Sequence, residues 1–320
     1  MSRRSIVWLI IGIVLVALGI FVGLTSGWDA PVRNDELITV ASFDPGEITA
    51  IRAEAGDAEI RIYSGYGEPL EVNVCGMSPK RVRVEMENGV LTVRQTEDTS
   101  LFRAFHRDGY IVLWLPDDLT GEITASTASG ELSINGLGNE GLTAALATSS
   151  GDVSVYDSVF STFSVATTSG DVYLGDLTLD GGLIANSSSG YVSLSGIRCR
   201  DASAHTSSGD ISLFDVRGES VQTQSASGWQ SLDDVRAAEA AFTAVSGDIT
   251  LRRMDVESLS IKTASGDIWA DLEGSLTDYA AEISTVSGDV EGVSPRADGE
   301  RSLNLTTVSG DIEVTFENGE

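Results

Sequence analysis

The dipeptide Ser-Gly recurs ten times in this chain at nearly constant spacing, and this repeat restricts the possible folds more than any other sequence feature. Its glycines are Gly130, Gly151, Gly170, Gly190, Gly209, Gly228, Gly247, Gly266, Gly288 and Gly310. Consecutive glycines stand 19 to 22 residues apart. A sustained period of this length indicates a solenoid, in which each repeat forms one coil that contacts only its neighbours.

Aligning the ten repeats on the glycine reveals apolar columns. Apolar residues fill most positions seven and five residues before the glycine and two and four residues after it, as in Leu183, Ala185, Val192 and Leu194 around Gly190. A spacing of two indicates strands with one buried face. The inward positions are odd before the glycine and even after it, so the chain must turn there. Glycine tolerates the backbone angles of such a corner.

A hydroxyl column accompanies the apolar ones. Ser or Thr stands three residues before the glycine in nine repeats, which predicts a hydroxyl ladder along the stack. These residues are Thr127, Thr148, Thr167, Ser187, Thr206, Ser225, Thr263, Thr285 and Thr307.

The columns together predict an all-β fold, a single-stranded parallel β-helix (β-solenoid) with coils of about 20 residues. Each coil would contain a strand, the Ser-Gly corner, a short strand, a second bend and a return segment. Successive coils would lie directly over one another with like residues about 4.8 Å apart, so ten coils would make a rod on the order of 48 Å long.

The domain organisation follows from the repeats and from the apolar N-terminus. We assign residues 1–5 to a cytoplasmic stub, 6–24 to a transmembrane helix, 25–35 to a linker and 36–320 to the solenoid. Within the solenoid, residues 119–320 form regular Ser-Gly repeats and residues 36–118 degenerate coils. In the degenerate part, 53–62 indicates a coil, 88–93 and 109–116 indicate strands, and 100–109 a loop.

Residues 6–24 form an uncharged apolar run of 19 residues, long enough to cross the hydrocarbon core of a bilayer as a helix. Arg3 and Arg4 precede the run and acidic residues follow it. The positive-inside rule therefore places the N-terminus in the cytoplasm and the solenoid outside the cell membrane. A cleaved signal peptide is the competing interpretation, although residues 24–30 (LTSGWDA) form a poor cleavage site.

Charge and cysteine content narrow the possible partners. The formal net charge is −28, from 48 acidic and 20 basic residues. Nucleic-acid binding needs a basic stripe, so we expect no nucleic-acid partner. Cys75 and Cys199 are the only cysteines and have no metal-ligand spacing, which favours two buried free thiols over a disulfide.

Residues 110–134 (YIVLWLPDDLTGEITASTASGELSI) join a hydrophobic strand ending in Leu-Pro to the first repeat, and repeats of the form T-x-S-G-D-hydrophobic follow. In these motifs the chain resembles the putative-adhesin β-strand-repeat family of bacterial proteins. The resemblance covers nearly all of the chain after the apolar N-terminus. It implies a β-helical, membrane-attached, surface-facing protein and says almost nothing about chemistry.

The residue directly after the corner glycine is acidic in eight of the ten repeats. Stacked carboxylates could hold Ca²⁺, a cation that prefers oxygen ligands, and the candidates are Asp152, Asp171, Asp248 and Asp267. A short carboxylate beside glycine also accepts hydrogen bonds from turn amides. We favour the structural role, because the nine-residue repeat of calcium-binding solenoids is absent, and expect no cofactor.

Aromatic residues interrupt this pattern in several repeats. Tyr191 and Trp229 replace the acidic residue, while Tyr173 and Trp269 stand three residues after their glycines, where side chains point outward. A solvent-facing aromatic strip would stack on sugar rings, which makes these four residues possible ligand contacts. Packing against a return loop and scattered surface exposure are the alternatives.

The sequence contains no recognisable catalytic set. Neither histidine, His106 or His205, lies in a nucleophile motif, and Lys80 and Lys262 are the only lysines, so we expect no enzyme. The favoured hypothesis is a membrane-anchored, extracellular adhesin-like or structural module that binds a surface glycan or an envelope protein. One alternative is a partner-binding component of a cell-envelope stress or assembly system. Another is a polysaccharide-active β-helix enzyme.

Overall fold

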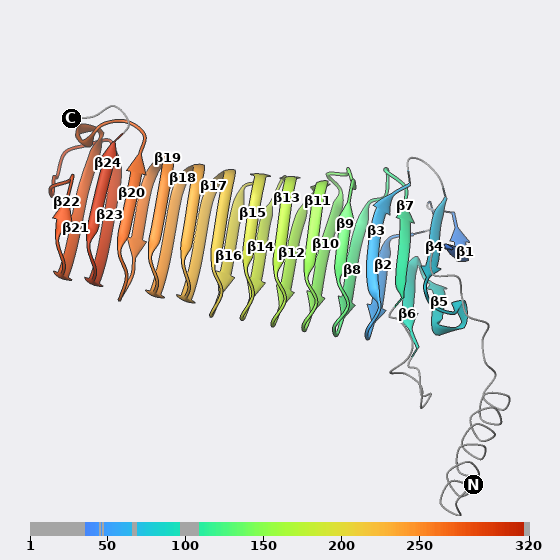
Figure 1. The fold of residues 1–320 in the computed structure, drawn as a ribbon. Helices are drawn as coiled ribbons and strands as arrows, with labels where there is room; N and C mark the ends of the chain where they lie inside the picture. The colour runs from blue at the N-terminus through green and yellow to red at the C-terminus, as the bar shows by residue number, and fades with distance from the viewer. Residues whose placement is uncertain (1–35, 45, 47, 66–68, 97–108, 317–320) are drawn as a thin grey trace, which may run out of the picture.

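The coils stack into one rod of mainly parallel strands, which confirms the predicted β-solenoid with coils of about 20 residues (Figure 1). The structure is a computed structural model that describes residues 36–44, 46, 48–65, 69–96 and 109–316. The expected stub, transmembrane helix and linker lie outside these residues, as does most of the expected loop 100–109. Among the residues that are described, no helix has the length and apolar character needed to span a bilayer.

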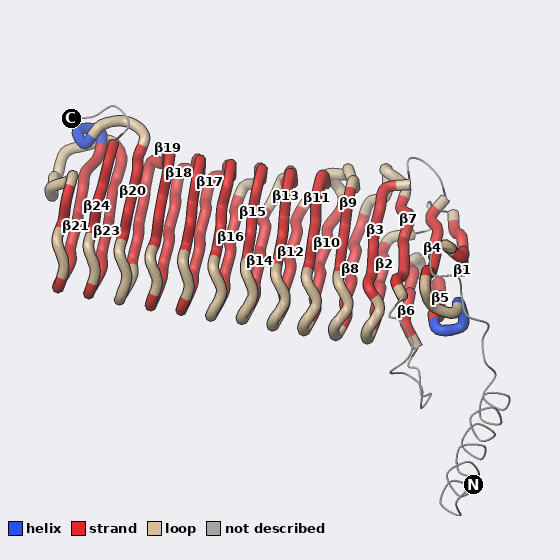
Figure 2. Tube along the Cα trace, viewed as in Figure 1, coloured by secondary structure: helices blue, strands red, loops and turns tan. Residues whose placement is uncertain are grey.

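In the regular part, each coil has one strand before the Ser-Gly corner and one after it. The strands before the corner are β8 (Gly121–Thr127), β10 (Leu142–Thr148), β12 (Thr162–Thr167), β14 (Gly182–Ser187) and β16 (Asp201–Thr206). Those after it are β9 (Leu132–Asn135), β11 (Val153–Phe160), β13 (Val172–Leu179) and β15 (Val192–Arg198). Three longer strands join both sides: β17 (Ile211–Ser227), β18 (Gln230–Ser246) and β19 (Ile249–Lys262). Figure 2 shows the turns between these segments aligned along the lower edge of the rod.

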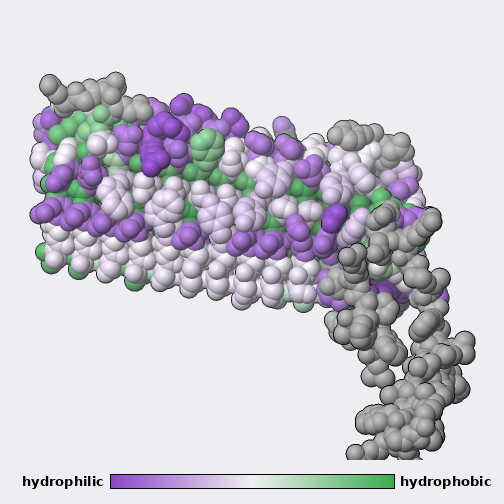
Figure 3. All heavy atoms as spheres, viewed as in Figure 1, coloured by the Kyte–Doolittle hydropathy of each residue, from purple (hydrophilic) through white to green (hydrophobic). Residues whose placement is uncertain are grey.

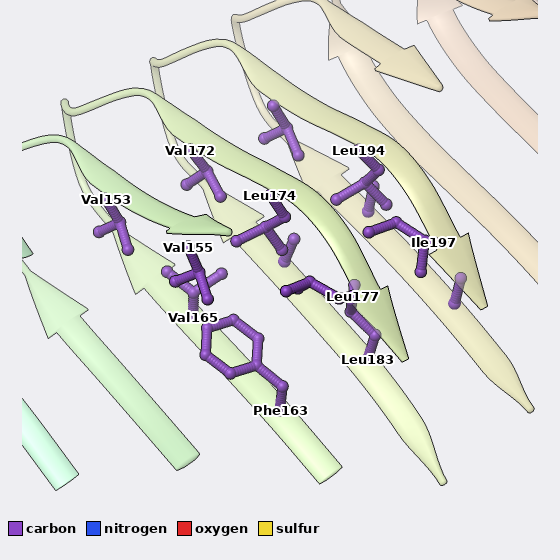
Figure 4. Close-up of a cluster of buried hydrophobic side chains, with 14 of the residues drawn as sticks. Val153, Val155, Phe163, Val165, Val172, Leu174, Leu177, Leu183, Leu194 and Ile197 are labelled. Carbon is purple, nitrogen blue, oxygen red and sulfur yellow. The ribbon is translucent and has the colours of Figure 1, made fainter. Parts of the chain in front are cut away.

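Like residues lie over like residues through the middle of the rod. Val153 pairs with Val172, Val172 with Val192 and Val192 with Ile211 in the parallel ladder. The side chains of Val153 and Val172 point into a narrow interior that lies between the two sets of strands (Figure 4). All four side chains are at most 1% exposed, so the period-two columns of the sequence are the core.

The Ser-Gly corner is tight because consecutive coils touch there through their backbones. A Cβ placed on Gly170 would lie 1.8 Å from the carbonyl oxygen of Gly151 in the preceding coil. The same contact recurs between Gly190 and Gly170. No side chain fits such a gap, and this crowding explains why glycine recurs at the corner.

The Ser/Thr column is buried at this corner, where it bonds to backbone groups. Thr206 Oγ1 accepts the N–H of Gly209 at 3.0 Å and donates to the carbonyl of Gly190 at 3.3 Å. Ser187 makes the equivalent pair of bonds to Gly190 and Gly170. Each hydroxyl thus links its own corner to the preceding coil. The column stacks in register along the rod, as the predicted hydroxyl ladder requires, with Thr148 paired to Thr127 and to Thr167.

The second bend is made by a residue in the left-handed region, six positions after the corner glycine. Asp157, Asp176, Asp215 and Asp234 have φ between 50° and 52° there, and Gly196 has φ 65°. Aspartate tolerates this conformation better than most residues because its short side chain bonds locally. Arg253, with φ 49°, is the exception in a column that is otherwise Asp or Gly from Gly136 to Asp234.

The N-terminal coils do not stack in chain order. The coil formed by β2 (Ala50–Ala55) and β3 (Glu59–Ser64) lies between the β8/β9 coil and the coil formed by β6 (Val90–Gln95) and β7 (Tyr110–Leu115). These strands agree with the coil and strands predicted at 53–62, 88–93 and 109–116.

The rest of the region expected to form degenerate coils is antiparallel. Strand β4 (Leu70–Cys75) pairs with β7, β1 (Ile38–Phe43) pairs with β4, and β5 (Val82–Glu87) pairs with β6. A 3₁₀ turn, η2 (Pro79–Arg81), precedes β5. The antiparallel strands cover the end of the stack, where open strand edges would otherwise invite pairing with another chain.

The C-terminal coils are also out of order, as Figure 1 shows at the red end of the rod. The last coil, β23 (Arg301–Ser309) and β24 (Ile312–Phe316), pairs with β19 and β20 (Ile268–Leu272) on one side. On its other side it pairs with β21 (Tyr279–Ser287) and β22 (Val290–Glu291), which follow the 3₁₀ turn η4 (Leu276–Asp278). The prediction that successive repeats stack in sequence is therefore wrong at both ends.

Candidate functional site

The aromatic and acidic side chains named as candidates lie on the side of the rod that is formed by the strands after the corner. Because positions two and four after each glycine point inward, positions one, three and five point outward. We call the surface made by these outward positions in the eight coils from Gly130 to Gly266 the post-corner face. Its aromatic residues are Tyr156, Tyr173, Tyr191, Phe214, Trp229 and Trp269.

The strands before the corner also have outward-facing residues, and these differ in character from those of the post-corner face. We call the outward positions eight, six and four before the glycine, in the coils from Gly151 to Gly266, the pre-corner face. Most of its residues are uncharged, with Asp201, Glu239 and Lys262 as its charged members, and it has no Phe, Tyr or Trp. The outward aromatic residues are therefore gathered on one side, which argues against scattered exposure.

Three tyrosines form one group on the post-corner face. Tyr156 is 40% exposed, and its ring lies against Gly175 of the next coil, where an added Cβ would be 2.5 Å from Cδ1. The rings of Tyr173 and Tyr191 have centroids 6.0 Å apart and planes inclined by 57°. Burial, followed by the 3.1 Å hydrogen bond that its hydroxyl donates to Asp171, raises the pKa of Tyr173.

Two tryptophans form a second group, which begins two coils beyond Tyr191. Trp229 is 48% exposed, and its Nε1–H donates to Thr250 Oγ1 at 3.3 Å. Thr250 in turn is the register neighbour of Trp269, which is 37% exposed. Trp229, Thr250 and Trp269 thus occupy three consecutive coils.

Sequence reasoning named four of the six aromatic residues and missed Tyr156 and Phe214. Phe214 is 50% exposed and lies in the coil between those of Tyr191 and Trp229. Both missed residues stand five positions after the glycine, at the end of the short strand. Their outward direction follows once the second bend is placed at position six.

The acidic column links coils to one another. Asp152 Oδ1 accepts the backbone N–H of Asp171 at 2.8 Å, and Asp248 Oδ1 accepts that of Asp267 at 2.9 Å. Asp171 and Asp267 accept the amides of Tyr191 and Asp311 in the same way, each at 2.8 Å. The carboxylates named as calcium candidates are therefore each bonded to the next coil's backbone, and whether they bind calcium, the less favoured interpretation, is untested. Among the described side chains, no three His, Cys, Asp or Glu residues are grouped as metal ligands would be.

The post-corner face is strongly acidic. Its eight acidic residues are Glu131, Asp152, Asp171, Asp210, Asp233, Asp248, Asp267 and Asp271, and Arg252 is its one basic residue. Figure 3 shows hydrophilic residues in a line along the rod, above a lower edge of near-neutral residues. That near-neutral edge matches the two small, exposed residues before each corner glycine.

The remaining sequence candidates lie elsewhere. His205 and Lys262 are on the pre-corner face in different coils, Lys80 is in η2, and His106 lies outside the described residues. Both cysteines are free thiols, as predicted, with Cys75 buried and Cys199 half-buried. Burial, with a smaller effect from Asp201, raises the pKa of Cys199 to about 11.

Solved structures that resemble this fold come from Parabacteroides and Clostridium species. A "putative adhesin" from Parabacteroides merdae is 14% identical, with 86% of this chain and 97% of that chain covered and a TM-score of 0.44. A "putative lipid binding protein" from Parabacteroides distasonis is 16% identical, with coverages of 87% and 96% and a TM-score of 0.43. A "putative cell adhesion protein" from Clostridium sporogenes is 11% identical, with coverages of 88% and 99% and a TM-score of 0.26. Similarity at this level identifies no ligand for this chain.

The sequence comparisons are more decisive about the family. No curated protein matches the chain. The Toastrack DUF4097 family matches residues 48–181 and again residues 175–315, which together include both non-sequential ends and the whole post-corner face. The chain therefore belongs to the Toastrack DUF4097 family.

Proposed function

We propose that this protein is a rigid, non-catalytic binding module of the bacterial cell surface, and that its post-corner face binds a glycan. The observation that supports this most is the confinement of six outward aromatic residues to one side of the rod. An aromatic ring provides a broad apolar surface for the C–H face of a pyranose. Neighbouring Ser, Thr and Asp side chains provide hydrogen-bond partners for sugar hydroxyls.

The scaffold suits such a role because the face is built on strands. The positions of Tyr173 and Trp269 are set by ladder register with the coils on either side. Binding groups on regular strands keep their relative positions better than groups on loops. A ligand would therefore meet a surface that is already arranged before binding.

In this proposal residues 6–24 anchor the protein in the membrane, with the solenoid outside the cell. The apolar run and the arginines before it support this orientation. A cysteine-reactive reagent that does not cross membranes would test it on intact cells, using Ser-to-Cys variants at the exposed corner residues Ser150 and Ser208. Labelling only after cell lysis would contradict the proposed location.

Glycan binding is tested with the full-length protein in an uncharged detergent on a glycan array. We expect the double variant Tyr191→Ala/Trp229→Ala to lose most of its binding. The matched control is Ile184→Ala, because Ile184 is a large apolar side chain, 48% exposed, on the pre-corner face. The proposal fails if the double variant and the control bind equally well.

A partner protein in the envelope is the second candidate. The pre-corner face, with its mostly uncharged side chains, would allow another protein surface to approach without burying many charges. Chemical cross-linking on intact cells, followed by purification of the full-length chain, would then yield one stoichiometric protein. Its absence, with glycan binding intact, would leave the glycan as the ligand.

A further inference from the structure

We infer that the ligand of the post-corner face is a polysaccharide with free amino groups, an inference that rests on the proposed glycan-binding function. Two features of the face lead to it. The aromatic residues require a ligand with a broad apolar surface. The eight acidic residues, against Arg252 alone, require a ligand that carries no negative charge.

The carboxylates and the rings are next to each other. Asp210 stands one position after its corner glycine, in the same column as Tyr191 and Trp229 and in the coil between them. Neighbouring strands are about 4.8 Å apart, so each ring begins one coil away from the carboxylate. An ammonium group bound to Asp210 would therefore lie one coil from each residue that carries a ring.

Asp210 is also available to a ligand. Its Oδ1 accepts the backbone N–H of Trp229 at 2.7 Å, and Asp210 is an exposed residue. That hydrogen bond holds the carboxylate beside the Trp229 backbone, and the second oxygen can accept a hydrogen bond from an amine. Charge-assisted hydrogen bonds of this kind are about twice as strong as neutral ones.

One arginine pairs with a carboxylate of the face, since Arg253 lies 2.5 Å from Asp233, and the other nearby arginines pair outside it. Arg217 pairs with Asp215 at 2.8 Å and approaches Asp234 at 3.8 Å, and Arg236 approaches Asp234 at 3.4 Å. Asp215 and Asp234 are second-bend residues, beyond the post-corner face. The face thus keeps most of its negative charge, and the net charge of −28 adds long-range attraction for a cationic chain.

An amino polysaccharide meets all these conditions in one molecule. Its pyranose rings would stack on the exposed tyrosine and tryptophan rings, and its ammonium groups would contact the carboxylates between them. An anionic polysaccharide would be repelled, and a neutral one would gain only the stacking. A cationic peptide would gain the charge interactions without the pyranose stacking.

The test compares two oligosaccharides with the same linkage, a fully deacetylated glucosamine oligomer and its N-acetylated counterpart. Full-length protein in an uncharged detergent is titrated with each by calorimetry at low and at high salt. We expect the deacetylated oligomer to bind about tenfold more tightly or better, and the difference to shrink at high salt. Polylysine serves as the cationic peptide.

Variants separate charge from stacking. Asp210→Asn keeps an oxygen that can accept the Trp229 amide, so the coil is preserved while the preference for the deacetylated oligomer falls by about fivefold or more. Trp229→Ala weakens binding of both oligomers by about tenfold. Ile184→Ala changes neither, and equal urea unfolding midpoints for Asp210→Asn and the parent confirm an intact fold.

Three outcomes would overturn the inference. Equal affinity for the two oligomers would show that the amino group does not contribute to recognition, but glycan binding would still stand. Binding of neither oligomer would exclude amino polysaccharides, and the array would then decide separately whether any glycan binds. Tight binding of polylysine and the deacetylated oligomer, both unchanged in Trp229→Ala, would show attraction by charge alone.

Discussion

The corner contact between coils predicts a large effect of one added methyl group. In Gly190→Ala the new Cβ would lie 1.9 Å from the carbonyl oxygen of Gly170 and 2.6 Å from its carbon. Ordinary contact begins at 3.4 Å, so the two coils must separate by about 1.5 Å at this corner. Gly182→Ala, in the same coil, is the matched control, because its Cβ would meet nothing closer than 3.7 Å.

The cost follows from the bonds at that corner. Separation weakens the 2.8 Å bond from the Gly190 amide to Ser187, the 3.2 Å bond from Ser187 to the Gly170 carbonyl, and the 2.8 Å bond from the Tyr191 amide to Asp171. Three such bonds contribute about 3 kcal/mol. Displaced backbone and packing add about 1–3 kcal/mol. We expect a total loss of about 4–6 kcal/mol, against a gain of about 0.4–1 kcal/mol for Gly182→Ala.

Urea unfolding of the full-length chain, followed by circular dichroism, measures this difference in the free energy of unfolding. Because coils interact mainly with their neighbours, hydrogen exchange should also accelerate first in β13 to β16, with the ends of the rod less affected. The reasoning is refuted if Gly190→Ala and Gly182→Ala have the same unfolding midpoint. Uniform acceleration of exchange along the whole rod would contradict the nearest-neighbour argument.

Three further predictions concern single positions. Thr206→Val removes the hydroxyl that links Gly209 to Gly190 and should cost about 1–3 kcal/mol in urea unfolding, whereas Thr206→Ser should cost less; equal losses would rule out the bridge. Asp157, with φ 52°, should tolerate Asp157→Gly, while Asp157→Val should lower stability by about 1–2 kcal/mol, and a harmless Val would contradict the left-handed bend. The raised pKa of Cys199, about 11 against 9.0, stabilises the fold below pH 9, and about 2 kcal/mol of this should be lost as pH rises from 9 to 11. Urea midpoints at pH 8 and 11 should therefore diverge more in the parent than in Cys199→Ala, and parallel changes would refute it.

Most of the solenoid could be predicted from the sequence because its determinants repeat locally. Val172, Val192 and Ile211 each stand two residues after a corner glycine, and the ladder pairs them as that spacing requires. A period of two defines the inward face of a strand, and a glycine at a fixed offset defines the corner. Neither inference needs information from distant parts of the chain.

The candidate site was predicted only in part, because its outward direction depends on where each strand ends. Tyr191 and Trp229 stood out by replacing an acidic residue in a regular column. Tyr156 and Phe214 lie next to the second bend, and the prediction placed no residue at that bend. The shared preference of Asp and Gly for the left-handed conformation was the available signal.

The order of coils at the ends was decided by tertiary structure alone. The repeats around Gly288 and Gly310 carry the same motif, so the sequence identifies both as coils without naming their neighbours. A coil inside the rod buries its apolar residues from two sides, which favours the repeat with the larger ones. Ile312 and Val314 are each 1% exposed in the inner coil, whereas Val290 of the outer coil is 39% exposed. The local pattern of residues thus determined which segments become coils, and competition for burial between whole coils determined their places in the stack.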